Sequence, residues 1–90
     1  MADFLRSSDL NTTSIEFLLT DLETALTFMD VAQTSRDQEI KQRNYANAHH
    51  AYDTVIRLLP KFKPTPAQQQ AIDEKLSLLK ARLEAVGELF

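Results

Sequence analysis

The chain contains no cysteine, one glycine and three prolines among its 90 residues. Without cysteine it has neither a disulfide scaffold nor a thiolate metal site. The shortage of glycine and proline leaves little material for tight turns, which favours a few long helices over many short strands. At this length we expect one domain. The hydrophobic content of 43% and the charged content of 26% are typical of a folded globular protein rather than a disordered one.

Long apolar segments are also missing. No run approaches the roughly 20 residues that a helix needs to cross a bilayer. The first ten residues, MADFLRSSDL, lack the basic and apolar regions of a signal peptide. We therefore expect a cytoplasmic protein that does not insert directly into a membrane.

Basic residues are absent from a long N-terminal stretch. Between Ser7 and Ser35 there is no lysine or arginine, and the formal charge of residues 1–35 is −5, from one basic and six acidic groups. Residues 36–90 carry nine basic and seven acidic groups, or +2. Because an acidic N-terminal third repels phosphate backbones, we expect no nucleic-acid partner.

Sequence signatures of catalysis and metal binding are absent as well. There is no glycine-rich phosphate loop, no nucleophile elbow and no His-Glu-x-x-His motif. The two histidines, His49 and His50, point about 100° apart on a helix and cannot hold one metal ion from one face. His49 precedes Asp53 by four residues, which predicts a surface hydrogen bond. We expect no enzyme activity, no cofactor and no bound metal.

The first of three helical segments has a clear start and two possible ends. Thr13 and Glu16 have the spacing of a capping box. Apolar residues then follow at helical spacing at Ile15, Leu18, Leu19, Leu22, Ala25, Leu26, Met29 and Ala32. The chain can break near Thr34–Ser35, where Ser35 with Gln38 is a second capping signature, or continue to Lys41 and turn at Arg43–Asn44. We favour the second end, because asparagine tolerates left-handed backbone. This predicts an N-terminal arm at 1–12 and a helix over 13–41.

The second and third segments have clearer ends. A helix over 44–59 is predicted to stop at Pro60, and its inward positions are Tyr45, Ala48, Tyr52, Val55 and Leu59. A helix over 66–88 starts with Thr65 as N-cap, Pro66 as first residue and Gln68 as capping partner. Its inward positions are Ile72, Leu76, Leu79, Leu83, Val86 and Phe90. Short connections between three helices predict an all-α, antiparallel up-down-up bundle with a long first helix.

The first helix has apolar residues on two sides, although two neighbouring helices can cover one side only. The outward residues are Phe17, Thr24, Phe28 and Val31. One interpretation is that the N-terminal segment folds back, so that Phe4, Leu5 and Leu10 cover them. The interpretation we favour is a docking or self-association surface. The acidic rim of Asp21, Glu23 and Asp30 then predicts a partner with basic residues flanking its apolar strip.

The third helix has a secondary line of small, basic and apolar residues beside its inward stripe. Lys75, Leu78 and Arg82 are its candidate partner-binding positions, with Ala71, Ala85 and Leu89 along the same line. Such a line can receive a peptide helix. The simpler interpretation, which we favour, is that it widens the buried stripe of a helix that touches two neighbours.

Two helical segments resemble known interaction domains. The residues that match the second helix of a tetratricopeptide (TPR) repeat are Asn44, Tyr45, Ala48, Tyr52, Val55 and Pro60, with Arg43 where those repeats have glycine. The residues that resemble the I-x-x-K … R-x-E-x-L pattern of microtubule-interacting and transport (MIT) domains are Ile72, Lys75, Arg82, Glu84 and Val86. The resemblance implies a non-enzymatic three-helix module that holds short helical peptides in a groove between helices.

Taken together, these patterns predict an adaptor or assembly module that binds a protein or helical peptide through helix–helix contacts. A second copy of the chain is one such partner, through the outer face of the first helix. The alternative is a structural subunit, or a chaperone-like cap, whose apolar face is completed inside a larger complex.

Overall fold

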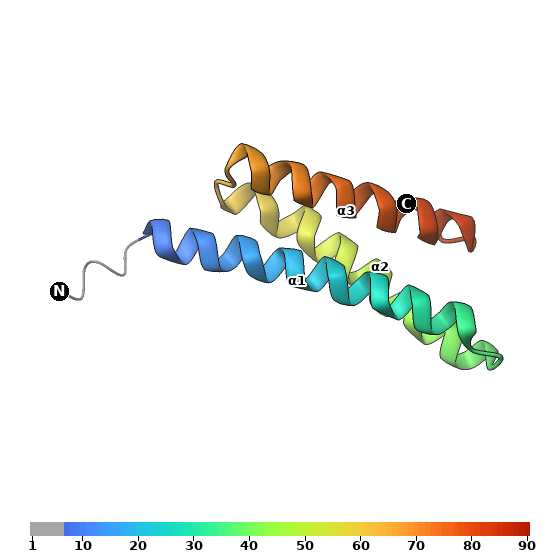
Figure 1. Ribbon diagram of the computed structural model, residues 1–90. Helices are drawn as coiled ribbons and strands as arrows, with labels where there is room; N and C mark the ends of the chain where they lie inside the picture. The colour runs from blue at the N-terminus through green and yellow to red at the C-terminus, as the bar shows by residue number, and fades with distance from the viewer. Residues whose placement is uncertain (1–6) are drawn as a thin grey trace.

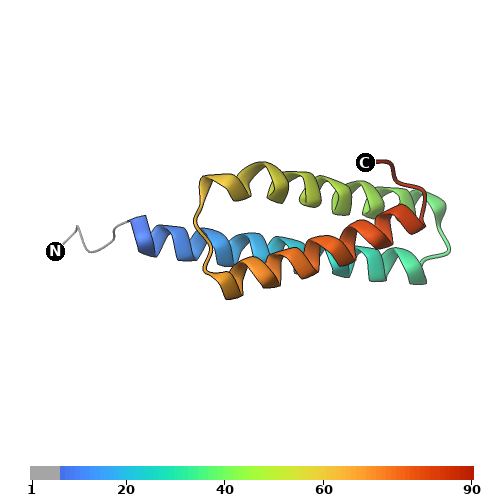
Figure 2. The same ribbon diagram turned by 90° about the horizontal axis from the view of Figure 1, so that it is seen from above.

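The computed structural model describes residues 7–90 as three helices joined by short connections (Figures 1 and 2). They are α1 (Ser7–Thr34), α2 (Gln38–Leu58) and α3 (Pro66–Ala85), with a single 3-10 turn, η2 (Leu59–Lys61), after α2. The chain runs up α1, down α2 and up α3, and the described residues contain no strand. The predicted all-α, up-down-up bundle is confirmed, and α1, with 28 residues, is its longest helix.

The predicted boundary between the first two helices was wrong. The chain breaks after Thr34, and α2 begins at Gln38 rather than after a turn at Arg43–Asn44. Asp37 has extended backbone, and its Oδ1 accepts from the backbone N–H groups of Glu39 and Ile40 at 2.8 and 3.3 Å. This N-cap satisfies two donors that a helix start leaves without partners. Asn44 lies inside α2, where its Nδ2 donates to the carbonyl of Ile40.

The predicted start of the first helix was also wrong. Residues from Ser7 onward are already helical, so Thr13 lies within α1 and is exposed instead of capping it. The bundle therefore begins before residue 13, and the predicted boundary between an arm at 1–12 and the first helix was wrong. Phe4 and Leu5, which were considered as a cover for the outer face, lie outside the described residues. Leu10 belongs to α1 itself.

Both ends of α3 are set by local hydrogen bonds. Thr65 and Gln68 form the predicted capping box, with Pro66 in the first turn. The helix ends at Ala85, three residues earlier than predicted, because Gly87 adopts a φ of +93°. The N–H of Gly87 donates to Glu84 and that of Glu88 to Leu83, the two bonds of a Schellman termination.

The core lies between the inward stripes of the three helices. Its buried residues are Ile15, Leu18, Leu22, Ala25, Met29, Ala32, Tyr45, Ala48, Val55, Ile72, Leu76, Leu79 and Leu83. All of them belong to the stripes predicted from sequence. Val86 and Phe90 were predicted to extend the third stripe, but both are exposed because α3 stops before them.

The three helices do not pack equally. α1 contacts both partners, and α2 and α3 contact each other least. In Figure 1, α3 diverges from the α1–α2 hairpin toward the end at which α1 joins α2. At the other end Asn11 joins α1 to the loop before α3: its Nδ2 donates to the Lys63 carbonyl at 2.9 Å, and its Oδ1 accepts from the Lys63 N–H at 2.6 Å. Within residues 7–90, no helix has the length and apolar character needed to cross a bilayer.

Candidate functional site

The outer face of α1 carries a continuous line of exposed, uncharged side chains. These residues follow one another at alternating steps of three and four, which places them on one side of the helix. They are Leu10, Thr13, Phe17, Thr20, Thr24, Thr27, Val31 and Thr34, and all are exposed. We call them the α1 strip. At a rise of 1.5 Å per residue, the strip is about 36 Å long.

Large apolar side chains in the α1 strip are accessible at intervals along its length. Leu10 is 63% exposed, Phe17 65% and Val31 46%. These three positions and Thr24 recur every seven residues, so they form one row. Together with the threonines between them, these three apolar residues form one uncharged line on a single side of the helix.

The threonines form the second row of the α1 strip, and two of them satisfy their own hydroxyl groups. Thr27 Oγ1 donates to the backbone carbonyl of Glu23 at 3.1 Å, and Thr34 Oγ1 donates to that of Val31 at 3.1 Å. Hydroxyls that are bonded to the preceding turn need no partner from outside the helix. A second surface can therefore cover these two threonines without leaving a buried donor unpaired.

Three of the four predicted outer residues of the first helix lie on this surface. Phe17, Thr24 and Val31 are exposed, as expected. Phe28 was assigned wrongly, since it is half-buried and packs against the core. It lies on the side of α1 at which Ser14 and Asp21 are also half-buried, at the edge of the inward stripe. Sequence reasoning missed the threonine row, although Thr13, Thr20, Thr27 and Thr34 recur every seven residues.

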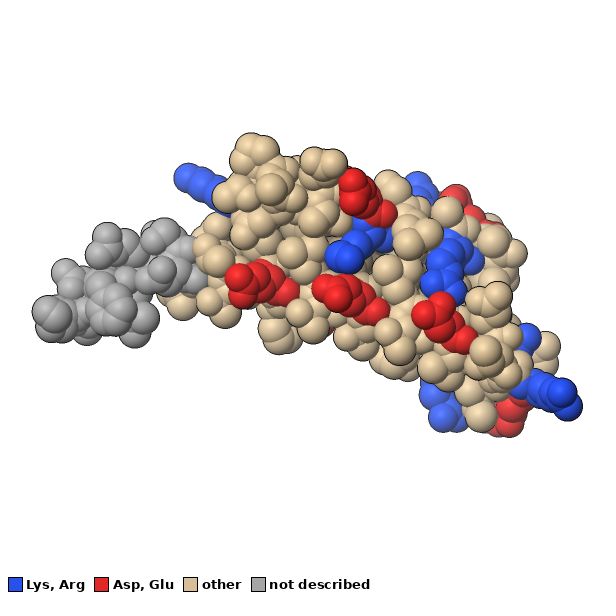
Figure 3. Space-filling view, viewed as in Figure 1, with Lys and Arg blue, Asp and Glu red and all other residues tan. Residues whose placement is uncertain are grey.

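An acidic edge borders the α1 strip on the side of α3. Glu16, Glu23 and Asp30 are exposed and recur every seven residues, and we call them the acidic edge. Figure 3 shows acidic side chains in a row along α1, with basic side chains beside them on α3. Between Ser7 and Thr34, α1 itself has no lysine or arginine. The charged residues that α1 contributes to the surface around the α1 strip are therefore all acidic.

The predicted line on α3 lies next to the acidic edge. Arg82 Nη2 donates to Asp30 Oδ1 at 2.7 Å, so these two residues engage each other. Lys75 and Arg82 are half-buried, and Leu78 is exposed. The line contacts α1 at Arg82 and presents Leu78 to solvent. Since Ala85 and Leu89 are exposed as well, the line does not widen the buried stripe as the simpler interpretation predicted.

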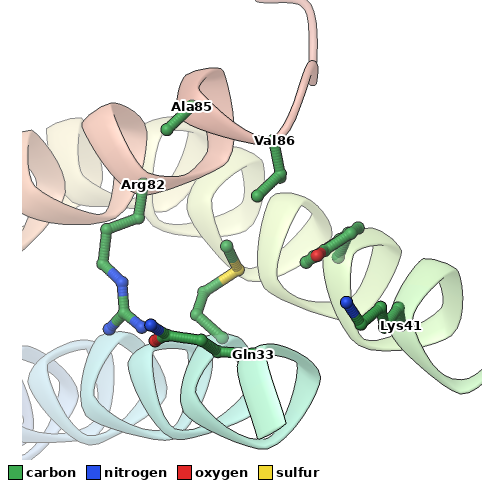
Figure 4. A pocket seen from close by; sticks show the side chains of 7 residues that line it. Gln33, Lys41, Arg82, Ala85 and Val86 are labelled. Carbon is green, nitrogen blue, oxygen red and sulfur yellow. The ribbon is translucent and has the colours of Figure 1, made fainter. Parts of the chain in front are cut away.

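A small open cavity lies at the end of the bundle where α3 diverges. It has a volume of about 300 Å³, and its lining residues are Met29, Gln33, Lys41, Tyr45, Arg82, Ala85 and Val86. In Figure 4, Arg82 from α3 and Gln33 from α1 extend toward each other, while Lys41 lies on the α2 side. Of its two cations, Lys41 and Arg82, the arginine is already held by Asp30. We assign no ligand site to this open cavity.

The residues after α3 fold back onto α2. His49 Nδ1 lies 2.8 Å from Glu88 Oε1, and the His49 ring is 4.4 Å from that of Phe90. Tyr52 contacts Phe90 edge-on at 5.0 Å, and the Lys80 ammonium lies over its ring. Figure 2 shows the C-terminal tail crossing toward α2. The predicted His49–Asp53 hydrogen bond was wrong: the closest approach is 3.7 Å, because His49 turns to Glu88.

The remaining chemistry of the described residues is limited. Within residues 7–90, no group of three histidine, aspartate or glutamate side chains lies close enough to hold a metal ion. Among residues 10–90 the buried side chains are all hydrophobic, so no charged side chain of that range lies within the core. The α1 strip is therefore the most distinctive surface of the molecule.

The chain matches no protein-family model, no curated protein and no solved structure.

Proposed function

We propose that the chain is a cytoplasmic, non-enzymatic adaptor or assembly module that binds a protein or helical peptide through the α1 strip. The observation that carries this proposal is the exposure of Phe17, which is 65% accessible in the middle of an uncharged row. A soluble domain gains little from an exposed phenylalanine between two other exposed apolar residues. Contiguous surfaces of this kind usually mark contacts with other proteins.

The spacing of the α1 strip favours a helix as the partner element. Alternating steps of three and four residues are the spacing at which two helices interlock side chains along their length. Threonine is small enough to let a second backbone approach closely, and Phe17 and Leu10 supply large apolar contacts. The resemblance to TPR and MIT helices agrees with a role in holding helical segments.

Capture with matched variants tests this function. The chain would be immobilised as wild type, as Phe17→Ser and as Ile56→Ser, where Ile56 is an α2 residue of comparable exposure, 47%. From an extract of the producing cells, we expect wild type and Ile56→Ser to retain a protein that Phe17→Ser does not retain. Light scattering of the purified chain across a range of concentrations would detect a second copy as the partner. If neither assay distinguishes Phe17→Ser from Ile56→Ser, the proposal is wrong.

The second candidate is a structural subunit, or a chaperone-like cap, that is completed inside a larger complex. It is favoured by apolar exposure outside α1, since Leu78 on α3 and Leu89 after it are accessible. A subunit enclosed by several neighbours needs more than one contact surface. This candidate predicts a monomer that binds an apolar dye, with binding reduced by Leu78→Ser as well as by Phe17→Ser.

A further inference from the structure

We infer that the partner of the α1 strip is a basic amphipathic helix of another protein, rather than a second copy of this chain. This inference rests on the proposed function. It follows from the charges that border the α1 strip, because residues beside a helix–helix seam decide which partners and orientations are favourable. The partner helix would carry small or apolar residues at alternating steps of three and four, with lysine or arginine beside them.

Two of the three exposed carboxylates of the acidic edge have no cation from the described part of the chain. Asp30 is engaged by Arg82 across the α1–α3 contact. Glu16 and Glu23 are exposed, and within residues 7–90 neither forms an ion pair. Each lies one helical turn from Thr20, so both flank the Phe17 section of the α1 strip. Cationic side chains on a docked helix would meet these two carboxylates.

On the opposite border of the α1 strip, α1 contributes no cation to balance them. There the half-buried positions are Ser14, Asp21 and Phe28, seven residues apart. Asp21 adds a third negative group, while Phe28 extends the apolar surface at the edge of the core. A partner therefore faces acidic groups on both sides of the α1 strip.

A second copy would bring like charges together in either orientation. If two α1 helices packed antiparallel through their strips, equivalent borders would meet, and Glu16 and Glu23 would face Glu23 and Glu16 of the other copy. If they packed parallel, the Glu16 border of one copy would face the Asp21 border of the other. In neither arrangement does α1 itself contribute a basic residue, because it has none. Like charges across a helix pair oppose association.

Two of the five threonine hydroxyls of the α1 strip do not oppose burial under such a helix, because Thr27 and Thr34 donate to carbonyls of their own helix. The charge pattern therefore indicates the kind of partner, and the apolar row indicates where it docks.

Two synthetic peptides of about four heptads test the inference. Both have leucine and alanine at the alternating seam positions; one has lysine and the other glutamate at the flanking positions. Fluorescence anisotropy would follow their binding to the full chain. We expect the lysine peptide to bind about tenfold more tightly or better than the glutamate peptide. The preference should shrink as the salt concentration rises, because screening weakens exposed charge contacts.

Variants of the chain separate seam contacts from general charge attraction. Phe17→Ser should abolish binding of the lysine peptide, and Ile56→Ser should not. The double variant Glu16→Gln, Glu23→Gln should weaken the lysine peptide roughly three- to tenfold. Glu84→Gln, an exposed α3 position outside the strip, should leave it unchanged. A scrambled lysine peptide of the same composition should bind no better than the glutamate peptide.

The outcomes distinguish this inference from the function on which it rests. Sedimentation velocity would show whether the chain alone forms a dimer that Phe17→Ser abolishes. Such a dimer would overturn the basic-partner inference and leave the α1 strip as a docking surface. Equal binding of the two peptides, equal binding of the scrambled peptide, or no binding at all would also overturn the inference. Capture through Phe17 of a partner that lacks a basic helix would also overturn the inference. If Phe17→Ser left all binding unchanged, both the inference and the proposed function would be wrong.

Discussion

Arg82 on α3 donates to Asp30 on α1 at 2.7 Å, and the two residues are 52 positions apart in the chain. Asn11 and Lys63, at the opposite end of the bundle, are also 52 positions apart. The two contacts hold α1 against α3 at one end of the bundle and against the loop before α3 at the other. Asp30, predicted to attract a basic partner, and Arg82, predicted to line a peptide groove, pair with each other. Asp30 stays exposed but already has a cation of its own chain, whereas Glu16 and Glu23 form no ion pair with the other described residues.

Loss of the Asn11 side chain should loosen the first turns of α1. Asn11→Ala removes two hydrogen bonds to the Lys63 backbone, and we expect a cost of about 1 kcal/mol because both groups are near solvent. Thr12→Ala, at the exposed neighbouring position, is the control. Hydrogen exchange of the α1 amides would measure the effect. Equal protection in the two variants would show that the contact does not hold α1 in place.

Leu79 and Leu78 are adjacent but should respond very differently to truncation. Leu79 is fully buried in the core, so Leu79→Ala should destabilise the fold by about 2–5 kcal/mol. Leu78 is exposed, and Leu78→Ala should change stability by less than about 0.5 kcal/mol. Chemical denaturation followed by circular dichroism would compare them. A cost below about 1 kcal/mol for Leu79→Ala would contradict the orientation of α3.

A negative charge should destabilise the fold at Phe28 but not at Phe17. Phe28→Asp places a charge at a half-buried position against the core, and we expect a loss of about 1–3 kcal/mol. Phe17→Asp places the same charge in solvent and should leave the melting temperature nearly unchanged. Thermal melts of the two variants, followed by circular dichroism, would test the difference. If Phe17→Asp lowered the melting temperature more than Phe28→Asp, then Phe28 rather than Phe17 would lie on the outer surface of α1.

The start of α2 depends on one carboxylate. Asp37→Ala removes the acceptor for the N–H groups of Glu39 and Ile40, so we expect a loss of about 0.5–2 kcal/mol. Arg36→Ala, the exposed preceding position, serves as the comparison. Denaturation midpoints would measure both. Equal midpoints would mean that the turn between α1 and α2 is held by other contacts.

The boundary errors had a common physical origin. Residues 35–44 contain two signals of a helix boundary, the left-handed tolerance of Asn44 and the side-chain acceptors at Ser35 and Asp37. The predicted boundary followed the first signal, whereas the chain uses the second. No residue other than Gly87 has positive φ in the described range, so that tolerance is not used. At Thr13, a capping-box spacing occurs within a helix that is already formed. Capping motifs identify an end only where the backbone on one side leaves the helix.

The sequence by itself determined the three helices, their inward stripes and the Thr65 cap, because helical spacing and capping bonds depend on residues only a few positions apart. It also determined that α1 has apolar residues on two sides and no basic residue. Only the tertiary structure decided that Phe17 faces solvent while Phe28 joins the core, and that Arg82 goes to Asp30. Those outcomes depend on how far each neighbouring helix covers α1 and on a register between residues 52 positions apart, which no local pattern encodes.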